Sequence, residues 1–251
     1  MLVQAIRLLL LWVFSAATFA EKPDVLPIYA YHADPPFVIS NAKRTGINYD
    51  FISALQKAQP GLTIEYRYRD RKTINALLKA GEPMIVMWTN PAWFENSEAY
   101  LWTRSLFWDK DIVVSRSISD FQFNSIGDLA GLRLGGREGY HYNGLENAKV
   151  TRVDAVNDQD NIQQLLDYKV DVIIISKSSF LYYVRNLQLY NKVKILGNPL
   201  TKFQRKLLVS THYKGFFPSL DASIGNIIQQ NSWHNRVMLY GLHDLYLEPQ
   251  N

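Results

Sequence analysis

The sequence predicts an α/β fold in which helices cover largely parallel sheets on both faces. Two observations lead to this prediction. Strand-like and helix-like segments alternate along almost the whole chain. Hydrophobic residues make up 47% of the 251 residues, enough for a sizeable core in one large domain or in two of about a hundred residues each. In this architecture, binding crevices open at the carboxyl ends of the strands.

Residues 1–20 have the pattern of a secretory signal peptide. Arg7 precedes a short apolar run at positions 8–14, and mostly small residues follow up to Ala20. The apolar run is too short for a comfortable transmembrane helix, although an uncleaved anchor is an alternative. We expect cleavage near Ala20, with Ala17 as the second choice, and a periplasmic location for the mature protein.

The composition excludes several classes of protein. The chain has no cysteine, so we expect neither a disulfide nor a lipid-modified cysteine anchor. Its 27 basic and 23 acidic side chains are spread out without a basic stripe, which argues against a nucleic-acid partner. The five histidines are dispersed and do not have the spacing of metal ligands. We expect no metal and no cofactor.

Strand and helix patterns follow one another in the first half of the chain. Ile47, Phe51 and Leu55 recur at helical spacing, and the unbroken apolar run at 84–88 is typical of a buried strand. Gly81 is expected to end a helix. The expected strands are 25–31, 62–68, 84–88 and 111–114, and the expected helices are 47–58 and 73–80.

The second half repeats this alternation. Within 132–142 the sequence predicts a short strand, a glycine turn and the first turn of a helix that Tyr140 opens. Further strands are expected at 150–153, 170–175, 193–196 and 206–209, with helices at 158–168 and 178–186 and a mostly helical tail from 218.

The glycine turn is a candidate ligand site. Gly135, Gly136 and Gly139 would let the backbone approach a ligand closely, and a helix start after them would direct free N–H groups at it. An ordinary strand-to-helix turn is the alternative, because the spacing is neither G-x-G-x-x-G nor that of a P-loop.

Five segments, in order, carry a resemblance. They are Asp34-Pro35-Pro36-Phe37 with Gly46 and Asp50, the Leu-Leu-Lys-Ala-Gly run at 77–81, the segment 125–135, the pair Gly139-Tyr140, and the segment 168–174. Together they resemble the bacterial extracellular solute-binding proteins of family 3, which are periplasmic binding proteins of type II that include amino-acid binders.

The resemblance implies two α/β lobes joined by two crossing strands. Residues 21–110 and 204–251 would form lobe 1, and residues 111–203 would form lobe 2, with crossings near 110–114 and 201–207. A small-molecule solute would bind between the lobes and favour their closed arrangement. The implied partner is a membrane permease or a sensor receptor, and we expect a monomer.

The chain departs from this family at two anchoring positions. Amino-acid binders carry an arginine for the ligand carboxylate where this sequence has Trp93, and an aspartate for the ammonium where it has Ser176. A buried zwitterion without paired charges would cost several kcal/mol. We therefore expect a ligand other than a standard free α-amino acid in the usual pose.

Aromatic side chains are expected to take over the contacts. Trp88, Trp93, Phe94, Trp102 and Trp108 cluster in sequence, and Tyr140 and Tyr142 would face them across the cleft. Such rings suit a flat ring, a sugar face or an organic cation, although most of them could instead pack the core. Trp88 and Tyr140 are the strongest candidates.

Charged and polar residues complete the expected site. Arg104 and Arg137 could clamp an anion or simply be solvated, and Asp34 or the adjacent His32 could select a cationic group or lie on a loop surface. The expected ligand contacts are Asp34, Phe37, Trp88, Thr89, Trp93, Arg104, Arg137, Gly139, Tyr140, His141 and Ser176.

The expected function is capture of a small polar or aromatic solute for an ABC-type importer. A ligand-sensing module for a membrane signalling receptor is the first alternative, because both roles need the same clamp. A periplasmic dehydratase-like enzyme that uses Glu138 is the second alternative. The sequence has no G-x-S-x-G or H-E-x-x-H pattern, and we expect no enzyme activity.

Overall fold

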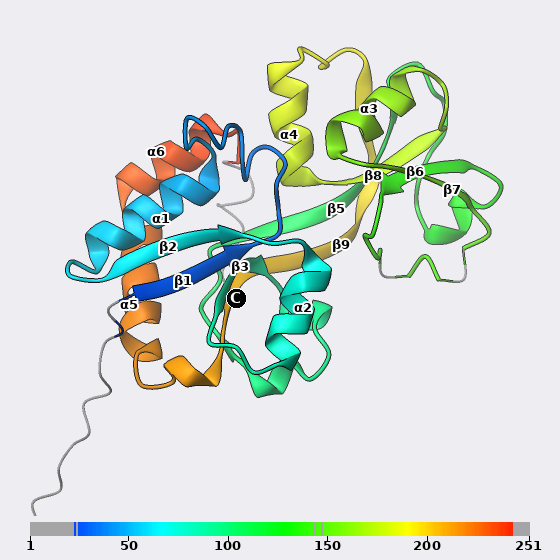
Figure 1. Ribbon diagram of the computed structural model, residues 1–251. Coiled ribbons are helices and arrows are strands. Elements are labelled where there is room, and N and C mark those ends of the chain that lie inside the picture. The colour runs from blue at the N-terminus through cyan, green and yellow to red at the C-terminus, as the bar shows by residue number, and fades with distance from the viewer. Residues whose placement is uncertain (1–22, 24, 143, 147, 243–251) are drawn as a thin grey trace, which may run out of the picture.

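Two lobes lie side by side, joined by the strands β5 (Phe107–Arg116) and β9 (Val193–Val209) (Figure 1). The computed structural model describes residues 23, 25–142, 144–146 and 148–242. The predicted signal peptide lies outside these residues, as does the end of the chain from 243. No helix in the described part has the length and hydrophobicity to cross a membrane.

Lobe 1 is built on a sheet in which β1 pairs in parallel with both of its neighbours, and β9 closes the row in the antiparallel sense. The strands, in spatial order, are β2 (Thr63–Tyr68), β1 (Val25–Ala30), β3 (Ile85–Thr89) and β9, with β4 (Leu101–Trp102) on β9. The helices are α1 (Ile47–Ala58), α2 (Arg71–Lys79), α5 (Phe217–Ile228) and α6 (Asn231–Leu239).

Each face of this sheet has its own core. Ile85 and Met87 pack into the cluster under α1, α5 and α6, whereas Val86 packs against Ile74 and Leu78 of α2 on the other face. This division follows from the alternation of side chains along a strand. The unbroken apolar run predicted at 84–88 is therefore a strand buried on both faces.

Lobe 2 repeats the same arrangement. In its sheet, β6 pairs in parallel with β7 and β8, and β5 pairs antiparallel with β8. Its strands are β6 (Arg133–Arg137), β7 (Thr151–Ala155) and β8 (Val172–Ser176), and its helices are α3 (Asp158–Leu166) and α4 (Lys177–Asn186). Asn157 caps α3, since its side chain accepts a bond from the Asp160 N–H at 2.8 Å.

The two connecting strands differ from the sequence prediction. Residues 193–196 and 206–209 belong to one strand, β9, instead of two. Its pairing with β5 shifts between Asp111, which faces Thr201, and Val113, which faces Leu196. This shift is a β-bulge or irregularity that lets one long strand serve both lobes. The lobe boundaries 21–110, 111–203 and 204–251 stay a prediction.

Two further expectations are corrected. The sheets are mixed instead of largely parallel, because β5 and β9 run antiparallel to their neighbours. Tyr140 opens no helix: the described residues between β6 and β7 form turns and irregular backbone. The next helix is α3, after β7.

Candidate ligand-binding cleft

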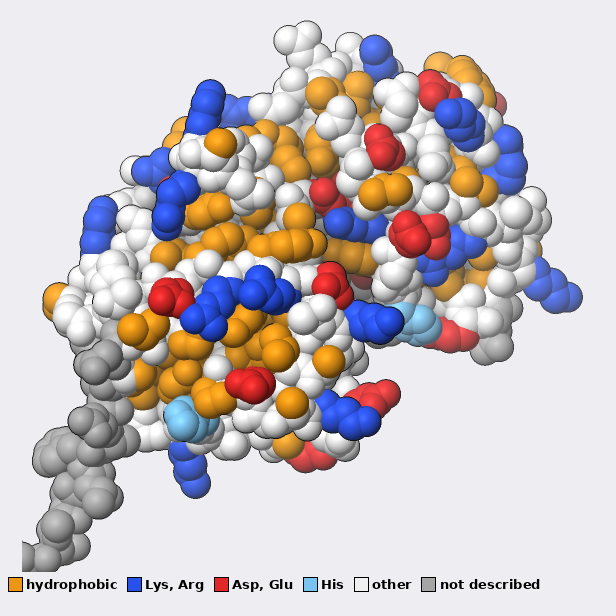
Figure 2. Space-filling model, in the orientation of Figure 1, with side chains coloured by type: hydrophobic (Ala, Val, Ile, Leu, Met, Phe, Trp, Pro, Cys, Tyr) orange, Lys and Arg blue, Asp and Glu red, His pale blue; other side chains and the backbone are white. Residues whose placement is uncertain are grey.

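A cavity of about 350 Å³ lies between the lobes. Tyr31, Phe37 and Trp93 contribute to it from lobe 1, and Tyr140 and Ser176 contribute from lobe 2. Figure 2 shows hydrophobic, acidic and basic side chains side by side where the lobes meet. A cavity of this size is typical of sites for small organic molecules.

Most of the predicted ligand contacts meet at this cavity. They come from the loop after β1, from the segment after β3, from the end of β6 and the turn that follows it, and from the end of β8. The predicted residues that line the cavity are Asp34, Phe37, Trp93, Arg137, Gly139, Tyr140, His141 and Ser176. Whether each contacts a ligand stays a prediction.

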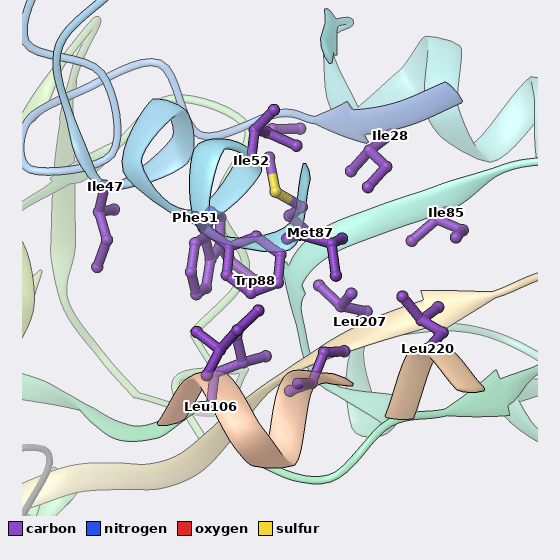
Figure 3. Close-up of a cluster of buried hydrophobic side chains, with 14 of the residues drawn as sticks. Ile28, Ile47, Phe51, Ile52, Ile85, Met87, Trp88, Leu106, Leu207 and Leu220 are labelled. Atoms are coloured by element: carbon purple, nitrogen blue, oxygen red, sulfur yellow. The ribbon is translucent and has the colours of Figure 1, made fainter. Parts of the chain in front are cut away.

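Trp88 is not part of the cavity wall. Its side chain has no exposed surface and packs edge-to-face against Phe51, with ring centroids 5.3 Å apart (Figure 3). Regular alternation along β3 would place the Trp88 side chain on the face covered by α2. Trp88 instead has a φ of 60°, at the point where the pairing of β3 with β9 shifts, and this irregularity changes the face on which its side chain lies. Trp88 therefore packs in the same cluster as Met87. The indole N–H donates to Asn48 at 2.6 Å. Trp88 is therefore a core residue.

Thr89 and Arg104 also lie away from the cavity. Thr89 is buried, and its hydroxyl donates to the Lys206 carbonyl at 3.2 Å. The Arg104 guanidinium forms an ion pair with Asp221 of α5 at 2.9 Å. It packs so closely on that helix that a Cβ at Gly225 would lie 2.2 Å from it. Arg104 therefore ties α5 to the segment between β4 and β5 within lobe 1 instead of clamping an anion.

The glycines after Leu134 serve different purposes. A Cβ at Gly135 would lie 2.5 Å from Asn161 Oδ1 and 2.7 Å from Ile173 Cγ2, so this glycine lets α3 pack on the sheet. Gly139 lines the cavity with φ +75°, a conformation that L side chains rarely adopt. Only the second of these two glycines places backbone beside the ligand space.

A buried ion pair forms the floor of the cleft. Arg205 of β9 donates to Asp109 of β5, with Nη2 2.7 Å from Oδ2. The two side chains are 3% and 0% exposed. The Ser178 hydroxyl at the start of α4 donates to the same carboxylate at 2.7 Å. Because the pair joins both connecting strands and contacts lobe 2, it fixes the junction between the lobes.

The same arginine decides the protonation of His32. Arg205 Nη1 lies 2.8 Å from His32 Nε2, and a guanidinium only donates. Nε2 must therefore accept, which places the single proton of a neutral imidazole on Nδ1. Burial lowers the pKa of His32 well below its usual value, and the charges of Arg205, Arg137 and Arg71 lower it further. His32 is thus a neutral member of the wall.

One ion pair crosses the cleft. Asp34, on the loop after β1 in lobe 1, binds the Arg137 guanidinium at the end of β6 in lobe 2, and each side chain is 15% exposed. The Arg137 guanidinium also lies 5.0 Å from the centre of the Tyr140 ring. The lobes therefore contact each other directly through charges at the cavity.

Arg71 supplies a positive charge to the lobe 1 wall. It lies in the first turn of α2, with its guanidinium 3.9 Å from the centre of the Phe94 ring. It donates to the Tyr31 hydroxyl at 3.1 Å and to Asn75 Oδ1 at 2.9 Å, and it also bonds to the Trp93 carbonyl. These partners are neutral, so its charge is available to the cavity.

Asp111 and Asp158 supply negative charges from the other side. Asp111 accepts a bond from the Thr201 hydroxyl at 2.8 Å, and burial raises its pKa to about 6, helped by the charges of Asp109 and Asp158. Asp158, at the start of α3, accepts a bond from the Ser179 hydroxyl, and burial raises its pKa as well. Both line the cavity.

Aromatic rings form the rest of the wall. Trp93 and Phe203 meet edge-to-face with centroids 4.8 Å apart, and both flank the Arg205 guanidinium. Tyr140 lies on the lobe 2 side, where burial raises the pKa of its hydroxyl to about 12. The cavity therefore combines flat apolar surfaces with charges of both signs, which suits a small polar solute that has an apolar or aromatic body.

Sequence reasoning missed several of these residues. Tyr31, Arg71, Asp111, Asp158 and Arg205 all line the cavity. A signal existed for one of them, because Asp109 and Asp111 lie at spacing two around the start of a predicted strand and so share a face. Glu138, on which the enzyme alternative rests, does not line the cavity. In the described part of the chain, no group of three metal-ligating side chains occurs.

Comparisons with known proteins support the fold. No protein-family model matches the sequence, and no curated protein matches it. Among solved structures, the substrate-binding protein of an amino acid ABC transporter has 17% identity and a TM-score of 0.66, over 86% of this chain and 98% of that one. An ancestral arginine-binding protein bound to arginine has 18% identity and a TM-score of 0.69, over 87% of this chain and 98% of that one.

A third similar structure is one domain of a longer protein. The periplasmic domain of BvgS from B. pertussis has 18% identity and a TM-score of 0.70, over 89% of this chain and 44% of that one. At such low identity these likenesses establish the architecture alone. The chain has the two-lobed fold of the periplasmic solute-binding proteins.

Proposed function

We propose that this protein works in the periplasm, where it captures a small polar or aromatic solute between its lobes and delivers it to an ABC-type importer in the membrane. The observation that carries the proposal is the cavity whose walls come from both lobes. A ligand in this position contacts both halves only when they are closed, so its binding energy favours the closed arrangement. The fold, shared with binding proteins, supports this role.

The proposed ligand is not a standard free α-amino acid held in the usual pose. Trp93 and Ser176 both line the cavity at the positions where the resemblance places the charged anchors of amino-acid binders. Ser176 instead caps α4, since its hydroxyl accepts a bond from the Ser179 N–H at 3.4 Å. The positive charges that line the cavity, on Arg71, Arg137 and Arg205, come from other elements, and two of them, on Arg137 and Arg205, already form ion pairs.

A sensing role is the second candidate. The likeness to the BvgS periplasmic domain favours it, because that domain has the same fold. Transport and sensing use the same closing movement and differ in what the closed protein contacts. Cross-linking of the closed protein to membranes of its own host, followed by identification of the bound protein, separates a permease from a signalling receptor.

A thermal-shift screen of the mature protein tests ligand capture. A ligand at a hundred times its dissociation constant should stabilise the fold by about 2.7 kcal/mol. Small-angle scattering with the same compound should report a smaller radius of gyration. Saturable binding without closure would contradict the proposal, and consumption of the compound over time would indicate an enzyme instead. Tight calorimetric binding of an α-amino acid that is weakened by changes at Trp93 and Ser176 would contradict the proposed ligand class.

A further inference from the structure

We propose that the solute carries a protonated amine or guanidinium group and that Asp111 and Asp158 receive this group. The inference rests on the proposed function, because it names the chemical class of the molecule held in the same cavity. It follows from the charges around that cavity and from how they pair.

The arginine and aspartate side chains at the cavity, counted together with their ion-pair partners, leave an excess of one negative charge. Arg71, Arg137 and Arg205 line it together with Asp34, Asp111 and Asp158, so the charges of the lining residues cancel. Asp109 lies directly behind Arg205 as its ion-pair partner and adds a fourth carboxylate. His32 is neutral, as its contact with Arg205 requires. A complementary ligand therefore carries a positive charge.

The pairing places this excess on one side of the cavity. Arg205 is engaged by Asp109, and Arg137 is engaged by Asp34 across the cleft. Asp111 and Asp158 accept bonds from the hydroxyls of Thr201 and Ser179, which satisfy a hydrogen bond but leave the charge in place. Among the described side chains, neither of these cavity carboxylates forms an ion pair, and only the more distant charges of Arg137 and Arg205 act on them to lower their pKa.

The two carboxylates are close enough to act together. Both line the same cavity, and Asp111 lies opposite Ser176 of β8 in the strand pairing, while Asp158 accepts a bond from Ser179, whose N–H donates to Ser176 at 3.4 Å. Asp158 is 8% exposed. When the lobes close on a ligand and exclude water, the repulsion between the two carboxylates grows unless a cation lies between them.

The opposite wall fits the rest of such a molecule. On the lobe 1 side, Trp93 offers a ring surface and Arg71 offers a positive charge that attracts an acceptor or an anionic group. The expected ligand therefore points its cationic end at lobe 2 and its apolar body, or an acceptor, at lobe 1. The apolar ring surface of Trp93 also favours contact with the hydrocarbon stem of an amine.

Matched sets of probes test this assignment. Tyramine, tyrosol and 3-(4-hydroxyphenyl)propionate share one ring and differ in an amine, a hydroxyl and a carboxylate; 1,4-diaminobutane, 1,4-butanediol and succinate form an aliphatic set. Calorimetry of the mature protein should find that an amine binds at least tenfold more tightly than its uncharged and anionic counterparts. Asp111→Asn and Asp158→Asn should each weaken that amine at least tenfold. Asp160→Asn is the control, because Asp160 lies on the same helix turn but outside the cavity.

The outcomes separate the inference from the proposed function. Tighter binding of a carboxylate or an alcohol, with lobe closure, would overturn the cation assignment and leave solute capture standing. Amine binding that survives both substitutions would also overturn it. Saturable closure with solutes from a wider screen, none of them cationic, would do the same, whereas the absence of any binding solute would refute solute capture itself.

Discussion

Replacing Asp111 by asparagine should make the ligand-free protein more stable at neutral pH. The pKa of Asp111 is raised to about 6 from 3.8, chiefly by burial and also by Asp109 and Asp158. Two pKa units correspond to about 3 kcal/mol when the group is fully ionised. Because the side chain is only partly buried, contact with water in the cavity reduces the expected gain to about 1–2 kcal/mol. Asparagine can still accept the Thr201 hydroxyl bond.

The pH dependence of this gain gives the prediction its sign. The folded protein holds the Asp111 proton more tightly than the unfolded chain does, so ionisation lowers the free energy of unfolding as the pH rises from about 4 to 7. The gain from Asp111→Asn should therefore be full above pH 7 and vanish below about pH 4. Below about pH 4 the side chain at position 111 is neutral in both the wild type and the variant.

Urea unfolding of the wild type and the variant between pH 4 and pH 8 measures this difference. Asp160→Asn is again the matched control, because Asp160 is exposed and bonds to Asn157 at the start of α3. It should show no such gain. A variant that is less stable than the wild type at pH 7, or a difference that stays constant with pH, would refute the reasoning. A gain in stability together with lost amine binding would also rule out unfolding as the cause of that loss.

Three further predictions follow from the same contacts. Trp88→Ala should lower the free energy of unfolding in urea by about 3–5 kcal/mol, because it leaves a cavity in the core. Trp93→Ala should lower it much less and should mainly weaken solute binding, because Trp93 lines the cavity between the lobes. Equal losses of stability in the two variants would contradict these placements. Asp109→Ala should cost about 3–5 kcal/mol because it strands the buried Arg205 charge, and an unchanged melting temperature would count against this. Asp34→Asn removes the ion pair with Arg137 that crosses the cleft, so it should increase the radius of gyration of the ligand-free protein in small-angle scattering. Asp171→Asn is the control, because it breaks an exposed ion pair within lobe 2 and should leave the radius unchanged. Identical radii in the wild type and both variants would show that the cross-lobe pair does not hold the lobes together.

Local patterns were sufficient to predict most of the secondary structure. The helix expected at 47–58 is α1, because apolar side chains at helical spacing need only one buried face. The run at 84–88 became the buried strand β3 for a similarly local reason. The alternation of such elements, with the motif resemblance, led to the two-lobed α/β fold. Where the prediction failed, as with the single strand β9, pairing with a distant strand replaced the local signal.

The cleft depended on contacts that no local pattern contains. Trp88 and Trp93 are equally aromatic and close in sequence, yet a shift in the pairing of β3 turns the first into the core, while the second faces the cavity. His32 and Arg205 lie 173 positions apart and meet only because β1 and β9 both reach the same end of lobe 1. Residue types and periodicity thus account for the lobes and for an aromatic site. Which charges face each other across the cleft, and which remain for a ligand, depends on tertiary packing, because ion pairing is a matter of distance in space and not of spacing in sequence.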